Sequence, residues 1–79
     1  MKYLVISCIQ TDLVWEDKSA NLTHFETLLG RVPSHAMVVV LPEMFATGFS
    51  MNPQKFAEPM DGPTVKWMRM QAKKNRKII

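Results

Sequence analysis

A single carboxylate stands directly after an uninterrupted apolar run in the middle of this chain. The run extends from Met37 to Leu41, Pro42 ends it, and Glu43 follows at once. A Val/Leu run of this length predicts a parallel strand that is buried on both faces. Ligands of open α/β sheets bind at the carboxyl ends of such strands, which is where Glu43 would stand. The pattern makes Glu43 a candidate general base, although a carboxylate after a strand is more often a solvated loop residue or a helix cap.

Apolar and aromatic residues follow the carboxylate closely. Met44, Phe45 and Phe49 are the neighbours that would enclose Glu43, and Gly48 permits the sharp backbone turn that the wall of a pocket needs. An apolar enclosure of this kind would tune a carboxyl group for proton transfer. Phe45 and Phe49 are therefore candidates for the lining of a substrate pocket, with core packing beneath a long loop as the alternative.

The elements expected around Glu43 alternate between strand and helix, so the predicted fold class is α/β with the order βαβα(β). Gly30 is placed to cap the first helix, and Pro63 stands in the first turn of the second. The expected elements are a strand over residues 3–9, a helix from about Ser19 to Leu29, a strand over residues 36–41, a loop over residues 42–60, a helix opening at Asp61-Gly62-Pro63 and a third strand from Lys77.

This pattern leaves the expected sheet incomplete. Two helices would have to pack against a sheet of only two full strands. Parallel sheets are normally covered on both faces and contain more strands than this. A chain of 79 residues forms at most one small domain. We infer that residues 1–79 are the beginning of a larger domain.

Composition and charge narrow the possible partners. No apolar run approaches the roughly 20 residues of a membrane span, so no membrane partner is expected. Cys8 is the only cysteine, which rules out an intrachain disulfide and agrees with a cytoplasmic location. We expect Cys8 to be a core residue, because unpaired cysteine is among the most buried residue types. His24 and His35 lack further ligands nearby in the sequence, so no metal site is expected.

The net positive charge of the chain comes from its last 14 residues. Residues 1–65 carry four basic and seven acidic side chains, whereas residues 66–79 carry six basic and no acidic ones. On a helical wheel the cations share one half with Met70, and Trp67 and Gln71 lie on the other half. We interpret the cations as a solvated helix face rather than a nucleic-acid or anionic-lipid patch, because no aromatic residues are interleaved with them.

Several segments together resemble the amino-terminal part of a known family. They are the strand Val5-Ile6-Ser7-Cys8-Ile9-Gln10-Thr11-Asp12, then Trp15, Asn21-Leu22, and the run Val40-Leu41-Pro42-Glu43-Met44-Phe45-Ala46-Thr47-Gly48-Phe49. The chain resembles the nitrilase superfamily, the carbon–nitrogen hydrolases, over its whole length. With Asp61-Gly62-Pro63 and Trp67-Met68 it is most similar to the ω-amidase branch, which acts on 2-oxoglutaramate.

The resemblance implies an αββα sandwich of which residues 1–79 are the incomplete amino-terminal segment. It also implies a Glu-Lys-Cys triad, in which Glu43 matches the general base, and it implies no cofactor and no metal. The lysine and the nucleophilic cysteine would lie beyond Ile79, and Cys8 matches neither. We therefore expect hydrolysis of the ω-amide of a small dicarboxylic acid through a cysteine acyl-thioester only in the full domain, as a homodimer, and an inactive isolated fragment.

A second class of function stays open from the residues alone. A non-enzymatic βαβα module would dock on another protein or an anionic surface through its open sheet edge and basic helix. The sequence after Ile79 discriminates between the two, because the enzyme requires a lysine and then a cysteine at later strand ends.

Overall fold

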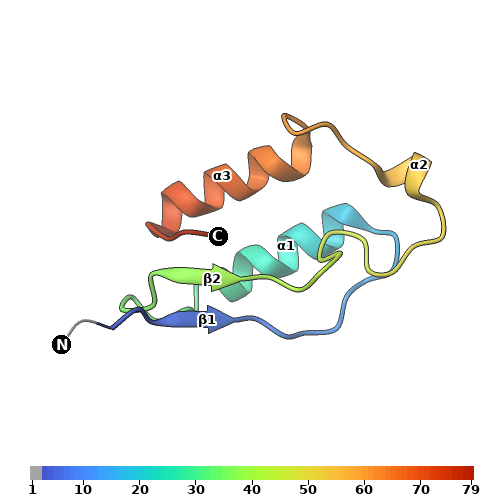
Figure 1. Ribbon diagram of the computed structural model, residues 1–79. Coiled ribbons are helices and arrows are strands. Elements are labelled where there is room, and N and C mark those ends of the chain that lie inside the picture. The colour runs from blue at the N-terminus through green and yellow to red at the C-terminus, as the bar shows by residue number, and fades with distance from the viewer. Residues whose placement is uncertain (1–2) are drawn as a thin grey trace.

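The computed structural model describes residues 3–79, which form a small parallel sheet with helices packed against it (Figure 1). The order of elements is βαβα(α), close to the predicted alternation. The elements are β1 (Ile6–Cys8), α1 (Lys18–Leu29), β2 (Val38–Val40), α2 (Pro53–Phe56) and α3 (Pro63–Asn75). The mixed α/β class is confirmed, and the one-turn helix α2 inside the predicted loop is the element that the sequence pattern does not indicate.

The sheet places β2 in its centre. β1 pairs with β2 in parallel, with Ile6 opposite Val38. On the other edge Ile78 forms a parallel bridge to Val38, and the backbone N–H of Val39 donates to the carbonyl of Ile78 at 2.7 Å. The strand predicted to begin at Lys77 is thus present as a single bridge at Ile78.

Within residues 3–79 the sheet is covered on one face only. In Figure 1, α1 and α3 lie on the same side of the two strands. Alternation along β2 sends Val39 toward the helices, where it is 1% exposed, whereas Val40 points away and is 48% exposed. The prediction that this run is buried on both faces is therefore wrong for residues 3–79, because no second layer lies against the side that carries Val40.

Both long helices begin and end close to the predicted positions. The Asp17 carboxylate caps α1 by accepting from the backbone N–H of Ala20 at 3.0 Å, and Gly30 is the C-terminal cap as expected. α3 starts at Pro63, whose missing N–H costs nothing in a first turn. It ends at Asn75, and the C-terminal cap Arg76 adopts the left-handed conformation with φ 54°.

The core lies between the sheet and the two long helices. Its fully buried apolar residues are Phe25, Leu29, Ala36 and Val39. α3 turns Gln71 inward at 2% exposure and leaves the cations of the helix itself on the exposed face. Lys77, which follows the helix, instead donates to the carbonyl of Pro33 at 3.0 Å. None of the described helices has the length and apolar character that crossing a bilayer requires.

Candidate active site

Glu43 lies just beyond the carboxyl end of the central strand. The last backbone hydrogen bond between β1 and the end of β2 runs from the N–H of Ile9 to the carbonyl of Val40 at 3.0 Å. Leu41 and Pro42 then leave the sheet, and Glu43 opens a turn that extends to Thr47. The structure thus places the carboxylate at the edge of the sheet where ligands of α/β folds bind.

The apolar enclosure expected for Glu43 is not formed by residues 3–79. Its side chain is exposed, and so are Met44 at 44% and Phe49 at 71%. The described part of the chain contains two ion pairs, Lys18–Glu58 and Lys74–Glu26, and Glu43 takes part in neither. The carboxylate is therefore available to groups outside the described residues.

The two candidate pocket aromatics lie in different environments. Phe45 points into the molecule, where its ring meets Phe25 edge-on at 5.6 Å between centroids and Trp67 at 5.9 Å. Its half-buried ring packs against these two aromatic side chains and also lines the cavity described below. Phe49 projects outward, and its backbone carbonyl accepts a hydrogen bond from the indole N–H of Trp15 at 2.8 Å. Phe49 is the more exposed of the two, and Phe45 is half-buried.

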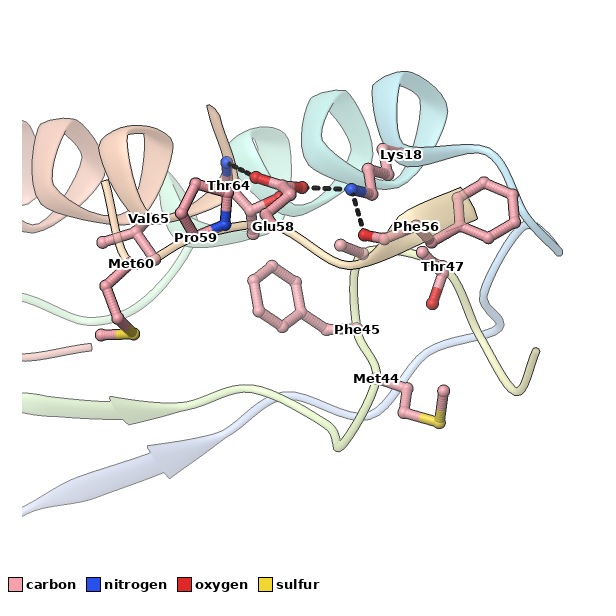
Figure 2. Close-up of a pocket in the computed structure, with 11 residues that line it drawn as sticks. Lys18, Met44, Phe45, Thr47, Phe56, Glu58, Pro59, Met60, Thr64 and Val65 are labelled. Carbon is pink, nitrogen blue, oxygen red and sulfur yellow. Dashed lines mark hydrogen bonds and ion pairs between the residues drawn. The ribbon is translucent and has the colours of Figure 1, made fainter. Parts of the chain in front are cut away.

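A cavity of about 310 Å³ opens between the Glu43 turn, the α2 segment and the start of α3 (Figure 2). Its lining residues are Lys18, Met44, Phe45, Ala46, Thr47, Phe56, Glu58, Pro59, Met60, Thr64 and Val65. Glu43 is not one of them, although Met44 and Phe45 follow it in the chain. The cavity therefore lies behind the Glu43 turn, on the side of the helices, and does not itself contain the candidate base.

A polar network closes one wall of this cavity, as Figure 2 shows. The Lys18 ammonium is paired with Glu58 and also donates to the carbonyl of Phe56 at 2.6 Å. The other Glu58 oxygen accepts from the backbone N–H of Thr64 at 2.8 Å. Burial disfavours the charged form of Glu58, but the hydrogen bonds from Lys18 and Thr64 outweigh it and lower the pKa of Glu58 to about 2.

This network ties α1 to the beginning of α3, and sequence analysis did not single out its members. Lys18 and Glu58 are 40 positions apart. No periodic pattern links them, and only the position of Thr64 in the first turn of α3 hints at a carboxylate partner. The network leaves Lys18 engaged, so this ammonium is not free to act on a substrate near Glu43.

Cys8 lies on the open face of the sheet and is exposed. The expectation of a core cysteine is wrong for the described residues, because its register partner Val40 is on the same uncovered side. Among residues 3–79, no three histidine, cysteine, aspartate or glutamate side chains gather as a metal site.

A strand of a parallel sheet ends just before Pro42-Glu43, and helices pack against that sheet. The sequence profile described as "Carbon-nitrogen hydrolase" matches residues 5–79. The chain belongs to the carbon-nitrogen hydrolase family. The resemblance seen in its motifs is thereby confirmed.

Relatives within the carbon-nitrogen hydrolase family carry amidase names. The chain is 44% identical over 69 residues to the omega-amidase YafV of Yersinia enterocolitica. The aligned region covers 87% of this chain and 26% of that protein. It is 38% identical to the omega-amidase YafV of Escherichia coli K12, over 100% of this chain and 30% of that protein. It is 32% identical to the 2-oxoglutaramate amidase of Bacillus subtilis, over 89% and 27% of the two chains.

A solved structure in the family shares the observed fold. XC1258 from Xanthomonas campestris, described as a CN-hydrolase superfamily protein with an arsenic adduct in the active site, superimposes with a TM-score of 0.82 and 42% sequence identity. The match covers 91% of this chain and 27% of that one. The chain thus spans between 26% and 30% of the length of these relatives.

Proposed function

We propose that residues 1–79 are the amino-terminal segment of an amidase that hydrolyses the ω-amide of a small dicarboxylic acid, such as 2-oxoglutaramate. The observation that carries the proposal is Glu43, an exposed carboxylate just after β2, the strand that pairs with β1 on one edge and bridges Ile78 on the other. The names of the relatives support the substrate class, since they include omega-amidases and a 2-oxoglutaramate amidase.

In the proposed reaction Glu43 is the general base. It removes the proton from a cysteine thiol supplied by the rest of the domain, and the thiolate attacks the amide carbon. The C–N bond breaks as the nitrogen takes up the proton and leaves as ammonia, which gives an acyl-thioester. Glu43 then takes a proton from water, which attacks the thioester, and the C–S bond breaks as the thiol is restored. A lysine of the later chain stabilises the oxyanion formed in each step.

The uncovered face of the sheet supports the proposed αββα arrangement. Ile6, Cys8, Val40 and Ile78 present an apolar surface on this side, with Ile6 50% and Ile78 64% exposed. Parallel sheets are normally buried on both faces. In the proposal a second sheet of the full domain covers this face. Cys8, which is exposed in residues 3–79, would then be buried beneath that sheet.

The test is a Glu43→Gln variant of the complete protein, which keeps the size of the side chain and removes its ability to accept a proton. Ammonia release from 2-oxoglutaramate should fall by about 10²- to 10⁴-fold, the usual contribution of a general base. Glu26→Gln is the matched control, because Glu26 lies on α1 in an exposed pair with Lys74. A Glu43→Gln protein that retains the rate of the unmodified protein, or an unmodified protein that releases no ammonia, would contradict the proposal.

A further inference from the structure

The position of Glu43 is not fixed by the sheet. After Val40 the strand makes no further ladder hydrogen bond, and Glu43 begins a turn in which Met44 adopts φ 54°. Left-handed backbone costs energy for a residue with a side chain and persists only where its surroundings hold it. Inside the turn, the N–H of Gly48 donates to the carbonyl of Met44 at 2.8 Å. The groups that hold this turn from outside therefore decide where the carboxylate stands.

Three hydrogen bonds reach the turn and the residues just after it, two from the segment that leads into α1 and one from α1 itself. The backbone N–H of Glu16 donates to the carbonyl of Thr47 at 2.7 Å, and the indole of Trp15 donates to the carbonyl of Phe49 at 2.8 Å. The third comes from the Asn21 side chain, whose Nδ2 donates to the carbonyl of Ala46 at 2.8 Å. This last bond is nearest to Glu43 in the chain.

Asn21 differs from the other two donors because its amide joins two segments at once. Its Oδ1 accepts from the N–H of Val14 at 2.7 Å, while Nδ2 also donates to the carbonyl of Val14 at 2.7 Å. The two carbonyl acceptors and one N–H donor fix the orientation of the amide. Asn21 is 1% exposed, so its amide has little access to water as a substitute partner.

We propose that Asn21 is a positioning residue that holds the turn carrying Glu43 by binding Val14 and Ala46 together. The inference rests on the proposed role of Glu43 as a base. Phe25 stands one turn further along α1 and packs against Phe45, so the same helix face that presents the Asn21 amide also supports the apolar side of the turn. Displacement of a base by about 1 Å can reduce a rate by 10²-fold.

The test compares Asn21→Asp with Gln71→Met in the complete enzyme. Asn21→Asp keeps the shape and the acceptor for Val14 N–H but places an oxygen against the carbonyls of Ala46 and Val14. Gln71 is also a buried amide, at 2% exposure, but it lies on α3, where its Oε1 accepts from Asn75 at 3.2 Å. We expect Asn21→Asp to lower kcat by about 10- to 100-fold with a smaller change in KM and to shift the pH profile of kcat/KM. Gln71→Met should change only the melting temperature.

Two further measurements separate a positioning role from a merely structural one. In a Glu43→Gln background, Asn21→Asp should cost little more activity, because both substitutions act on the same step. Hydrogen exchange at the amides of Thr47 and Gly48, which both donate to Met44, should accelerate in Asn21→Asp and not in Gln71→Met. A lower melting temperature with unchanged kcat and pH profile would overturn the inference.

The exchange measurement does not depend on the reaction. If the unmodified protein has no amidase activity, the proposed function fails, whereas faster exchange confined to the Glu43 turn would still support the positioning role of Asn21. Unchanged exchange at Thr47 and Gly48 would overturn that role whatever the activity.

Discussion

The ion pair between Lys18 and Glu58 should make the free energy of unfolding depend on pH under acidic conditions. Exposed surface carboxylates should contribute little to this dependence. The pair joins the start of α1 to the segment before α3, and its side chains are 27% and 15% exposed. Glu58 also accepts two hydrogen bonds from Thr64, one from the backbone and one from the hydroxyl at 2.6 Å. Protonation of this carboxylate therefore disrupts several contacts together.

The sign follows from the direction of the shift. The pKa of Glu58 falls from 4.5 to about 2 on folding, because the hydrogen bonds from Lys18 and Thr64 exceed the cost of burial. The stabilisation is present above pH 4.5 and is lost as the pH falls toward 2. At about 1.4 kcal/mol per pH unit, the full difference would correspond to roughly 3 kcal/mol. Solvent reaches both side chains and screens the pair, so we expect about 1–2 kcal/mol.

The assay is urea denaturation of the complete protein at several pH values between 7 and 2.5. Glu58→Gln should lower the free energy of unfolding at pH 7 by about 1–2 kcal/mol and should flatten its decline below pH 4.5 relative to the unmodified protein. Glu26→Gln is the control, because Glu26 and Lys74 form an exposed pair at 3.3 Å that should contribute little. The reasoning is refuted if Glu58→Gln and the unmodified protein lose stability in parallel below pH 4.5.

Two substitutions test the packing and the helix ends by thermal or chemical unfolding of the complete protein. Phe25→Ala should lower the free energy of unfolding by about 3–5 kcal/mol, since Phe25 is fully buried, whereas Phe49→Ala at an exposed site should stay within about 0.5 kcal/mol; equal effects would contradict the assigned core. Arg76→Gly should raise stability by about 0.5–1 kcal/mol because glycine accepts the left-handed cap of α3. Arg69→Gly inside the same helix should lower it by about 1 kcal/mol, and a loss at both positions would argue against the cap.

The sequence predicted what depends on neighbouring residues. Gly30 indicated the end of α1, and Gly62-Pro63 indicated the start of α3, because capping is a local property. The apolar run before Pro42 likewise predicted the central strand and the position of Glu43 at its end. These predictions did not depend on which helices and strands are in contact.

The contacts that shape the candidate site were not predictable in this way. Asn21 was noticed only as part of a family resemblance, and nothing in its neighbours says that its amide reaches Ala46, 25 positions away. The same holds for Lys18 and Glu58. A polar residue in a helix sequence is usually solvated, so its burial between two loops becomes visible only when the chain is folded.

The two errors about burial have one physical cause. The sequence of β2 is apolar on both faces, and Cys8 belongs to a residue type that is usually buried, yet Val40 and Cys8 are both exposed on the side of the sheet away from the helices. Glu43 leaves the sheet at the end of this same strand and is also exposed. Both predictions assumed a layer against each face of a parallel sheet, and residues 3–79 place helices on one face alone, so the side that carries Val40 and Cys8 stays exposed.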